Sequence, residues 1–196
     1  MTPKQVLQLY RPHDYTIPSL IESRAAVSPD KDAVCFEARC WSYAELVAGS
    51  VLLAKLLRMR GVTKGDRVAH VAPNSDLTIL LLLAAARVGA VFTPMNVELS
   101  DVDLDYMLGH SQAKIVFARG SDADRLTGIL TRRGQSASVV ALETLASDDT
   151  SSGASIKALQ QLTAEAPSID ESPIDAETHV LIIYTSGTTG FPKAVL

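Results

Sequence analysis

The chain has few of the residues that mark several functional classes. Its 196 residues include two cysteines, one tryptophan and 5% aromatic residues, and its net charge is −4. No cluster of positive charge stands out, so nucleic acid is not an expected partner. Cys35 and Cys40 have no second cysteine pair and no nearby histidine, so the spacing of a zinc site is absent. We expect both cysteines to be small core residues of a reduced, cytoplasmic protein.

No segment is long and apolar enough to suggest a membrane span. The most apolar stretch, residues 77–92, is shorter than the roughly 20 residues that a transmembrane helix needs, and Arg87 interrupts it. This stretch is better explained by a buried helix followed by a buried strand, with Arg87 extending its charged head to the surface. The first six residues contain no apolar core of a secretory signal.

Short apolar runs alternate with longer segments of helical periodicity. Strands are predicted at residues 32–38, 39–43, 67–71, 90–93, 114–118, 137–142 and 178–184, and helices at 18–27, 44–59, 75–87, 101–109, 121–133 and 156–164. This alternation predicts the α/β class, with βαβ units and a mostly parallel sheet. Pro94 is expected to end the strand at 90–93. Residues 147–154 are small and polar, and are expected to form a flexible linker.

The strongest functional signal lies at residues 180–196. The apolar run 180–184 predicts a buried strand, and it leads into hydroxyl and glycine residues followed by Pro192 and Lys193. The loop residues are Thr185, Ser186, Gly187, Thr188, Thr189 and Gly190. Glycines let backbone N–H groups approach an anion closely, the hydroxyls can donate hydrogen bonds, and the lysine adds a compact positive charge. The pattern predicts a loop that binds phosphate oxygens.

Two alternatives for this loop are weaker. A Thr/Gly-rich surface turn is common, but the string is too long and specific to be explained well by chance. The Walker phosphate-binding motif requires a glycine directly before the lysine and Ser or Thr directly after it. Here Pro192 precedes Lys193 and Ala194 follows it, so the Walker motif is excluded.

The string resembles the phosphate-binding loop of the adenylate-forming enzymes, which include acyl-CoA synthetases, luciferases and peptide-synthetase adenylation domains. It matches the family pattern until Ala194, where the family has a glycine. Further segments resemble family motifs in order and spacing at 40–46, 61–68, 83–96 and 104–117. The resemblance covers the chain from about residue 18 onward. The Pro94-Met95-Asn96 turn favours acyl-CoA synthetases over peptide-synthetase domains.

The resemblance implies a fold, an activity and a set of site residues. Residues 1–196 would be the incomplete N-terminal part of the large AMP-binding domain, ending just after the phosphate loop. Family members use ATP and Mg²⁺ to convert a carboxylic acid to an acyl-adenylate, and then pass the acyl group to a thiol such as that of CoA. Residues 185–190 and Lys193 would hold the β- and γ-phosphates. Lys193 would act catalytically by neutralising their charge, and Thr185 would help to hold Mg²⁺.

Three other hypotheses stay open. The chain could belong to an adenylation domain that serves a carrier protein. It could be a non-catalytic, truncated product that at most binds nucleotide weakly, or a folding fragment that needs its missing C-terminal portion. An unrelated flavodoxin-like domain would explain the alternation but not the loop. The histidines at positions 13, 70, 110 and 179 are expected to be structural, and Asp148-Asp149 to be part of a solvated linker.

Overall fold

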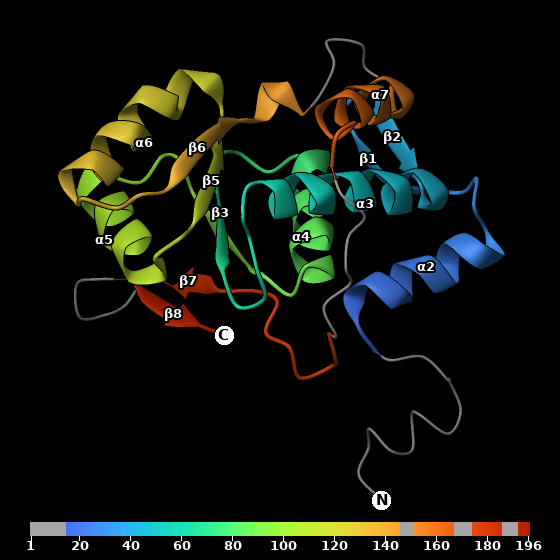
Figure 1. Cartoon of the computed structure of the whole chain (residues 1–196), viewed down its shortest axis with the longest axis horizontal. Helices are drawn as coiled ribbons and strands as arrows, with labels where there is room; N and C mark the ends of the chain where they lie inside the picture. Colours follow the sequence, from blue (N-terminus) through green and yellow to red (C-terminus); the bar gives the residue numbers. More distant parts are fainter. Residues whose placement is uncertain (1–14, 146–150, 167–173, 186–191) are drawn as a thin grey trace, which may run out of the picture.

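The protein is built around a parallel four-stranded sheet (Figure 1). The computed structural model describes residues 15–145, 151–166, 174–185 and 192–196. The strand order is β4-β3-β5-β6, with bounds Val91–Met95 (β4), Arg67–Val71 (β3), Ile115–Ala118 (β5) and Ser138–Ala141 (β6). Parallel neighbours need crossover connections, and helices supply them here. The predicted α/β class with a mostly parallel sheet is confirmed.

Helices cover both faces of this sheet. They are α2 (Ile17–Val27), α3 (Tyr43–Met59), α4 (Asp76–Arg87), α5 (Asp101–Ser111), α6 (Gly120–Arg132) and α7 (Ser152–Leu162), with a 3-10 turn, η1, at Leu142–Thr144. Helices α3 and α4 lie on one side of the sheet and α5 and α6 on the other (Figure 1). Within the described ranges, no helix has the length and apolar character needed to cross a membrane.

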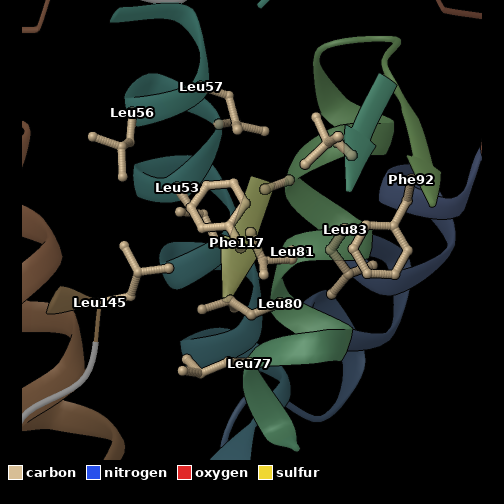
Figure 2. Close-up of a cluster of buried hydrophobic side chains, with 14 of the residues drawn as sticks. Leu53, Leu56, Leu57, Leu77, Leu80, Leu81, Leu83, Phe92, Phe117 and Leu145 are labelled. Atoms are coloured by element: carbon tan, nitrogen blue, oxygen red, sulfur yellow. The ribbon is translucent and has the colours of Figure 1, made fainter. Parts of the chain in front are cut away.

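The larger hydrophobic core lies under α3 and α4. Leucines of both helices pack around Phe92 of β4 and Phe117 of β5, as Figure 2 shows. Gly49 lies where these helices approach each other, and a Cβ atom there would lie 3.0 Å from the side chains of Leu80 and Trp41. The absence of that atom therefore allows close packing of α3 on α4.

The hairpin of β1 (Asp32–Phe36) and β2 (Arg39–Ser42) corrects the expectation for the cysteines. Cys35 and Cys40 are exposed, face each other across the hairpin and form a disulfide. Successive side chains of a strand point to opposite faces. Trp41 is fully buried, so its neighbour Cys40 must face outward. The prediction of reduced core cysteines was wrong because the aromatic ring takes the buried face.

Asp76 is a buried charge that joins separate segments. It is 1% exposed, and its Oδ2 accepts hydrogen bonds of 2.6 Å from both Arg39 Nε and Trp41 Nε1. Arg39 Nη1 also donates to Ser155 Oγ of α7 at 3.4 Å. A buried carboxylate needs such partners, because water no longer stabilises its charge. Asp76 therefore links the hairpin to the start of α4, and Arg39 extends the link to α7.

Arg87 also differs from its expected position. It is 6% exposed instead of extending to the surface. Its Nε donates to Ser50 Oγ at 2.8 Å, and its Nη1 lies 2.5 Å from Glu22 Oε1. Glu22 belongs to α2, which packs on α4. A carboxylate from a distant segment therefore pairs with the guanidinium, which was expected to be solvated at the surface.

Two boundaries differ from the predicted ones. Pro94 lies inside β4 instead of ending it. The N–H and the carbonyl of Phe92 form hydrogen bonds with residues 180 and 182, on the side of β4 that faces away from β3. Backbone nitrogens two residues apart in a strand face the same side, so the nitrogen of Pro94 also faces away from β3. Its missing N–H therefore removes no bond to β3.

Helix α7 begins at Ser152, so residues 152–154 of the predicted linker are helical, and 146–150 lie outside the described residues.

We predict that Asp76→Ala destabilises the fold. The substitution leaves Arg39 and Trp41 without their shared acceptor, which should lower the free energy of unfolding by about 3 kcal/mol. Urea denaturation followed by tryptophan fluorescence measures this change. Asp124→Ala, at an exposed position of α6, is the matched control and should change stability by less than about 0.5 kcal/mol. Equal stability of the two variants would contradict a structural role for the buried charge.

Candidate functional site

The strand that leads into the predicted phosphate loop extends the parallel sheet beyond β4. The N–H of Phe92 donates to the carbonyl of Val180 at 2.9 Å, and the N–H of Ile182 donates to the carbonyl of Phe92 at 2.9 Å. Leu181 forms a parallel bridge with Phe92. The chain therefore leaves residue 182 toward the edge at which β3 and β4 end. Open α/β sheets bind ligands at this carboxyl edge.

The two ends of the predicted loop are held together by a short hairpin. β7 (Ile183–Thr185) pairs with β8 (Lys193–Val195) in antiparallel fashion, and Thr185 lies directly opposite Lys193. Thr185 Oγ1 donates to the carbonyl of Lys193 at 3.4 Å, and both residues are exposed. The remaining loop residues, Ser186, Gly187, Thr188, Thr189 and Gly190, lie outside the described residues. The structure thus brings together the first hydroxyl and the lysine of the motif.

Ala194, which stands where the family has a glycine, is an ordinary strand residue here. It pairs with Tyr184, it is exposed, and it is not among the residues with positive φ. A strand position with ordinary φ accepts a Cβ atom without strain. The departure from the family pattern therefore leaves the backbone after Lys193 intact.

Tyr184 fastens the start of the loop to α5. Its hydroxyl donates to the carbonyl of Met107 at 3.2 Å, and His110 Nδ1 lies 2.9 Å from the same oxygen. The hydroxyl has one proton, so His110 Nδ1–H is the donor in the second bond. Burial raises the pKa of Tyr184 above its usual value, which keeps the phenol neutral. Sequence reasoning gave His110 no such role, because no local pattern links α5 to a residue 74 positions later.

A cavity of about 370 Å³ opens beside Thr185. Asn96, directly after β4, and Asp103, in the first turn of α5, supply polar groups to its wall, and Pro192 lines it from the far end of the loop. The site therefore combines a hydroxyl, an amide and a carboxylate, with the exposed Lys193 paired to Thr185. The rest of the wall is largely apolar, so the positive charge that phosphate oxygens need comes from Lys193 beside the cavity and not from its lining.

The other candidates from the sequence lie elsewhere. His70 of β3 is 1% exposed and lies 3.4 Å from Thr78 of α4 through its Nε2. Burial lowers the pKa of His70 to about 4, as expected for a neutral ring packed in a core. His179 is exposed, and His13 lies outside the described residues. Within the described ranges, the group that combines three potential metal ligands lies in the β1–β2 hairpin and not at Thr185.

The fold and the site together define the class of the protein. A parallel α/β sheet whose added strand leads into a segment rich in hydroxyls and glycines, closed by a lysine, is the architecture of a nucleotide-binding α/β domain. The family model described as AMP-binding enzyme matches residues 21–196. The chain belongs to this family, and the resemblance to adenylate-forming enzymes is confirmed.

Curated relatives include a CoA synthase, a CoA ligase and a surfactin synthase subunit. The feruloyl-CoA synthase of Amycolatopsis sp is 33% identical over 173 residues, covering 88% of this chain and 31% of that protein. The long-chain-fatty-acid–CoA ligase FadD13 of Mycobacterium tuberculosis is 29% identical, covering 90% and 34%. Surfactin synthase subunit 1 of Bacillus subtilis is 30% identical, covering 94% and 5%. The chain thus spans about a third or less of these relatives.

Solved structures agree with this assignment. A fatty acyl CoA synthetase of Mycobacterium tuberculosis is 26% identical, with a TM-score of 0.68, over 92% of this chain and 34% of that chain. VinN in complex with 3-methylaspartate has a TM-score of 0.73 over 93% and 47%, and its 24% identity supports the fold alone. The shared fold extends over nearly all of this chain.

We predict that His70 makes the fold sensitive to acid. An unfolded histidine titrates near 6.5, whereas burial lowers the folded pKa of His70 to about 4. Between these values the unfolded chain binds the proton, so the stabilisation is present above pH 6.5 and is lost as the pH falls toward 4. The loss should reach about 3 kcal/mol. Urea denaturation from pH 7 to 4 should show a shallower decline for His70→Leu, while the exposed control His179→Leu should follow the wild type.

Tyr184→Phe should loosen the attachment of the loop strand to α5. Loss of the hydroxyl removes two hydrogen bonds and should cost about 1 kcal/mol of stability. Thermal or urea unfolding of Tyr184→Phe, His110→Ala and the double variant should give a coupling of about 0.5 kcal/mol or more. Tyr43→Phe, at the start of α3, is the matched control. Strict additivity of the two substitutions would show that His110 and Tyr184 do not act together.

Proposed function

We propose that this chain provides the phosphate-binding part of an enzyme that activates a carboxylic acid with ATP. The products of this step are an acyl-adenylate and pyrophosphate, and the acyl group then passes to the thiol of CoA. Membership of the AMP-binding family supports adenylate formation. The CoA step is supported by the names of two relatives, a feruloyl-CoA synthase and a long-chain-fatty-acid–CoA ligase.

The observation that carries the proposal is the pairing of Thr185 with Lys193 at the carboxyl edge of the sheet. A carboxylate must attack the α-phosphate of ATP, so two anions approach each other while pyrophosphate leaves. Positioning and neutralisation of phosphate charge are therefore the main tasks of the protein. The loop 185–190 would donate backbone and hydroxyl hydrogen bonds to the β- and γ-phosphates.

Lys193 is the residue best suited to the neutralising role. It is the only lysine or arginine in residues 180–196, and its side chain is exposed rather than buried in the hairpin. Its backbone is fixed opposite Thr185, while its flexible side chain can follow the phosphates. The Thr185 hydroxyl would help to hold Mg²⁺, which takes oxygen ligands and most of its remaining coordination from phosphate and water.

An adenylation domain that loads a carrier protein is the second candidate. Surfactin synthase subunit 1 is nearly as similar to this chain as the feruloyl-CoA synthase, at 30% against 33% identity. The two candidates differ only in the acceptor, so acyl transfer to free CoA or to carrier phosphopantetheine separates them. A third candidate is a chain that binds nucleotide but needs a further portion for catalysis. The cytoplasmic location stays a prediction.

We predict that Lys193→Ala abolishes most of the adenylation activity. Loss of the single cation should lower acid-dependent exchange of labelled pyrophosphate into ATP by about 100-fold. The assay uses ferulate and long-chain fatty acids as carboxylates, with this chain alone and with the chain extended to the length of its relatives. Lys157→Ala is the matched control, because Lys157 is an exposed lysine on α7.

The outcomes of this assay separate the candidates. Exchange by the isolated chain that is lost in Lys193→Ala would show that these residues suffice. Exchange by the extended chain alone would support the incomplete-chain hypothesis. Equal exchange by the Lys193→Ala and Lys157→Ala variants would overturn the role of Lys193.

A further inference from the structure

The outer face of the β1–β2 hairpin gathers three groups that bind metals. The carboxylate of Asp32 and the Sγ atoms of Cys35 and Cys40 all lie within 4.8 Å of one another. Thiolate and carboxylate are both ligands of Zn²⁺. No part of the proposed adenylation chemistry uses these side chains, so the cluster requires its own explanation.

An irregularity in β1 brings the third group to this face. Asp32 and Cys35 are three positions apart, so a regular strand would place them on opposite faces. The register shifts between Asp32 and Val34, so that Asp32 pairs with Ser42 while Cys35 pairs with Cys40. Ser42 and Cys40 are two positions apart and share a face of β2. The bulge therefore turns Asp32 to the side of both cysteines, which is a common use of such irregularities.

The two cysteines can form either a disulfide or a pair of thiolate ligands. Cys35 and Cys40 are cross-strand partners with Cα atoms 4.1 Å apart, and the pairing of β1 with β2 also holds the two residues side by side through backbone groups. In the disulfide each sulfur uses its bonding capacity on the other, so neither is a thiolate ligand. After reduction, the two sulfurs need to separate to roughly 3.8 Å to hold one tetrahedral ion with Zn–S distances of about 2.3 Å.

We propose that, once the Cys35–Cys40 disulfide is reduced, Asp32, Cys35 and Cys40 bind one thiophilic divalent cation, with Zn²⁺ as the representative ion. Two thiolates and one carboxylate fill three tetrahedral positions, and water fills the fourth because the site is exposed. The disulfide and the metal site exclude each other. The proposal does not depend on the function proposed above.

The exchange between the two states balances in atoms and electrons. A phosphine reductant and one water molecule convert the disulfide to two thiols, and the phosphine becomes its oxide. Binding of the cation then displaces the two thiol protons, so affinity should rise with pH until both thiols are ionised. Reoxidation by a small-molecule disulfide forms the Cys35–Cys40 bond and releases the cation, while the small disulfide takes up the two electrons and leaves as two thiolates.

The test is a metal titration of the chain after reduction and removal of the phosphine without oxygen. Co²⁺ reports thiolate ligation through its charge-transfer absorption, and Zn²⁺ competition against a chromophoric chelator gives the affinity. The variants are Cys35→Ser, Cys40→Ser and Asp32→Asn. The matched control is Glu37→Gln, because Glu37 is an exposed acid at the tip of the same hairpin and is outside the cluster.

We expect the reduced chain to bind one equivalent of Zn²⁺, which protects both thiols from alkylation, and the oxidised chain to lack this site. Asp32→Asn should weaken Zn²⁺ binding by about tenfold or more, and each Cys→Ser variant by about 100-fold or more, whereas Glu37→Gln should bind like the wild type. Binding by the reduced wild type no tighter than by Cys35→Ser would overturn the site. Equal affinity of Asp32→Asn and Glu37→Gln would overturn the role of the carboxylate.

Discussion

The position of the candidate site depends on two backbone hydrogen bonds of Phe92. The N–H of Phe92 donates to the carbonyl of Val180, and the carbonyl of Phe92 accepts from the N–H of Ile182. These bonds join a segment near residue 180 to a strand almost ninety positions earlier. They set the direction of the segment parallel to β4, so the following residues emerge at the carboxyl edge of the sheet. Thr185 and Lys193 therefore lie at this edge because Phe92 fixes the segment that precedes them.

Side-chain contacts then hold the added segment and the covering helices. Tyr184 reaches α5 through Met107 and His110, which fixes the residue just before the loop. On the other face, Asp76 and Arg87 are buried charges, each paired with groups from separate segments. Breaking a buried pair leaves an uncompensated charge, so these contacts penalise any other arrangement of the hairpin and α2. The scaffold under the site is therefore held by specific polar contacts as well as by the leucine core.

Much of the fold followed from local patterns. The helices predicted at 44–59 and 101–109 begin within one residue of α3 and α5, and in the structure Ser42 and Ser100 each accept a hydrogen bond from the backbone N–H three residues later. Errors arose where a partner from elsewhere decided the outcome. Arg87 was expected at the surface because the sequence around α4 gives no sign that Glu22 of α2 pairs with it. Pro94 was expected to end a strand because it has no N–H to donate. The sequence does not show which strands pair with β4, and this pairing decides whether the missing N–H removes a hydrogen bond.

The cysteines show the same limit in another form. Their spacing and number gave no sign of a metal site, and their small size suggested a core position. In the structure, the hairpin register pairs Cys35 with Cys40 on the outer face and not in the core. The irregularity in β1 brings Asp32 to the same face. The face on which a side chain lies follows from strand pairing, and a shift of a single residue changes it.

The amino-acid sequence by itself determined the α/β alternation, most helix and strand positions, the family and the residues of the predicted phosphate loop. These features follow from periodicity, capping residues and a contiguous motif, all of which are local. Only the tertiary structure decided that Thr185 faces Lys193, that His110 supports Tyr184, and that Asp32 joins the two cysteines. Each of these depends on the register and packing of segments far apart in the chain, which are set by burial and hydrogen bonding of the whole fold.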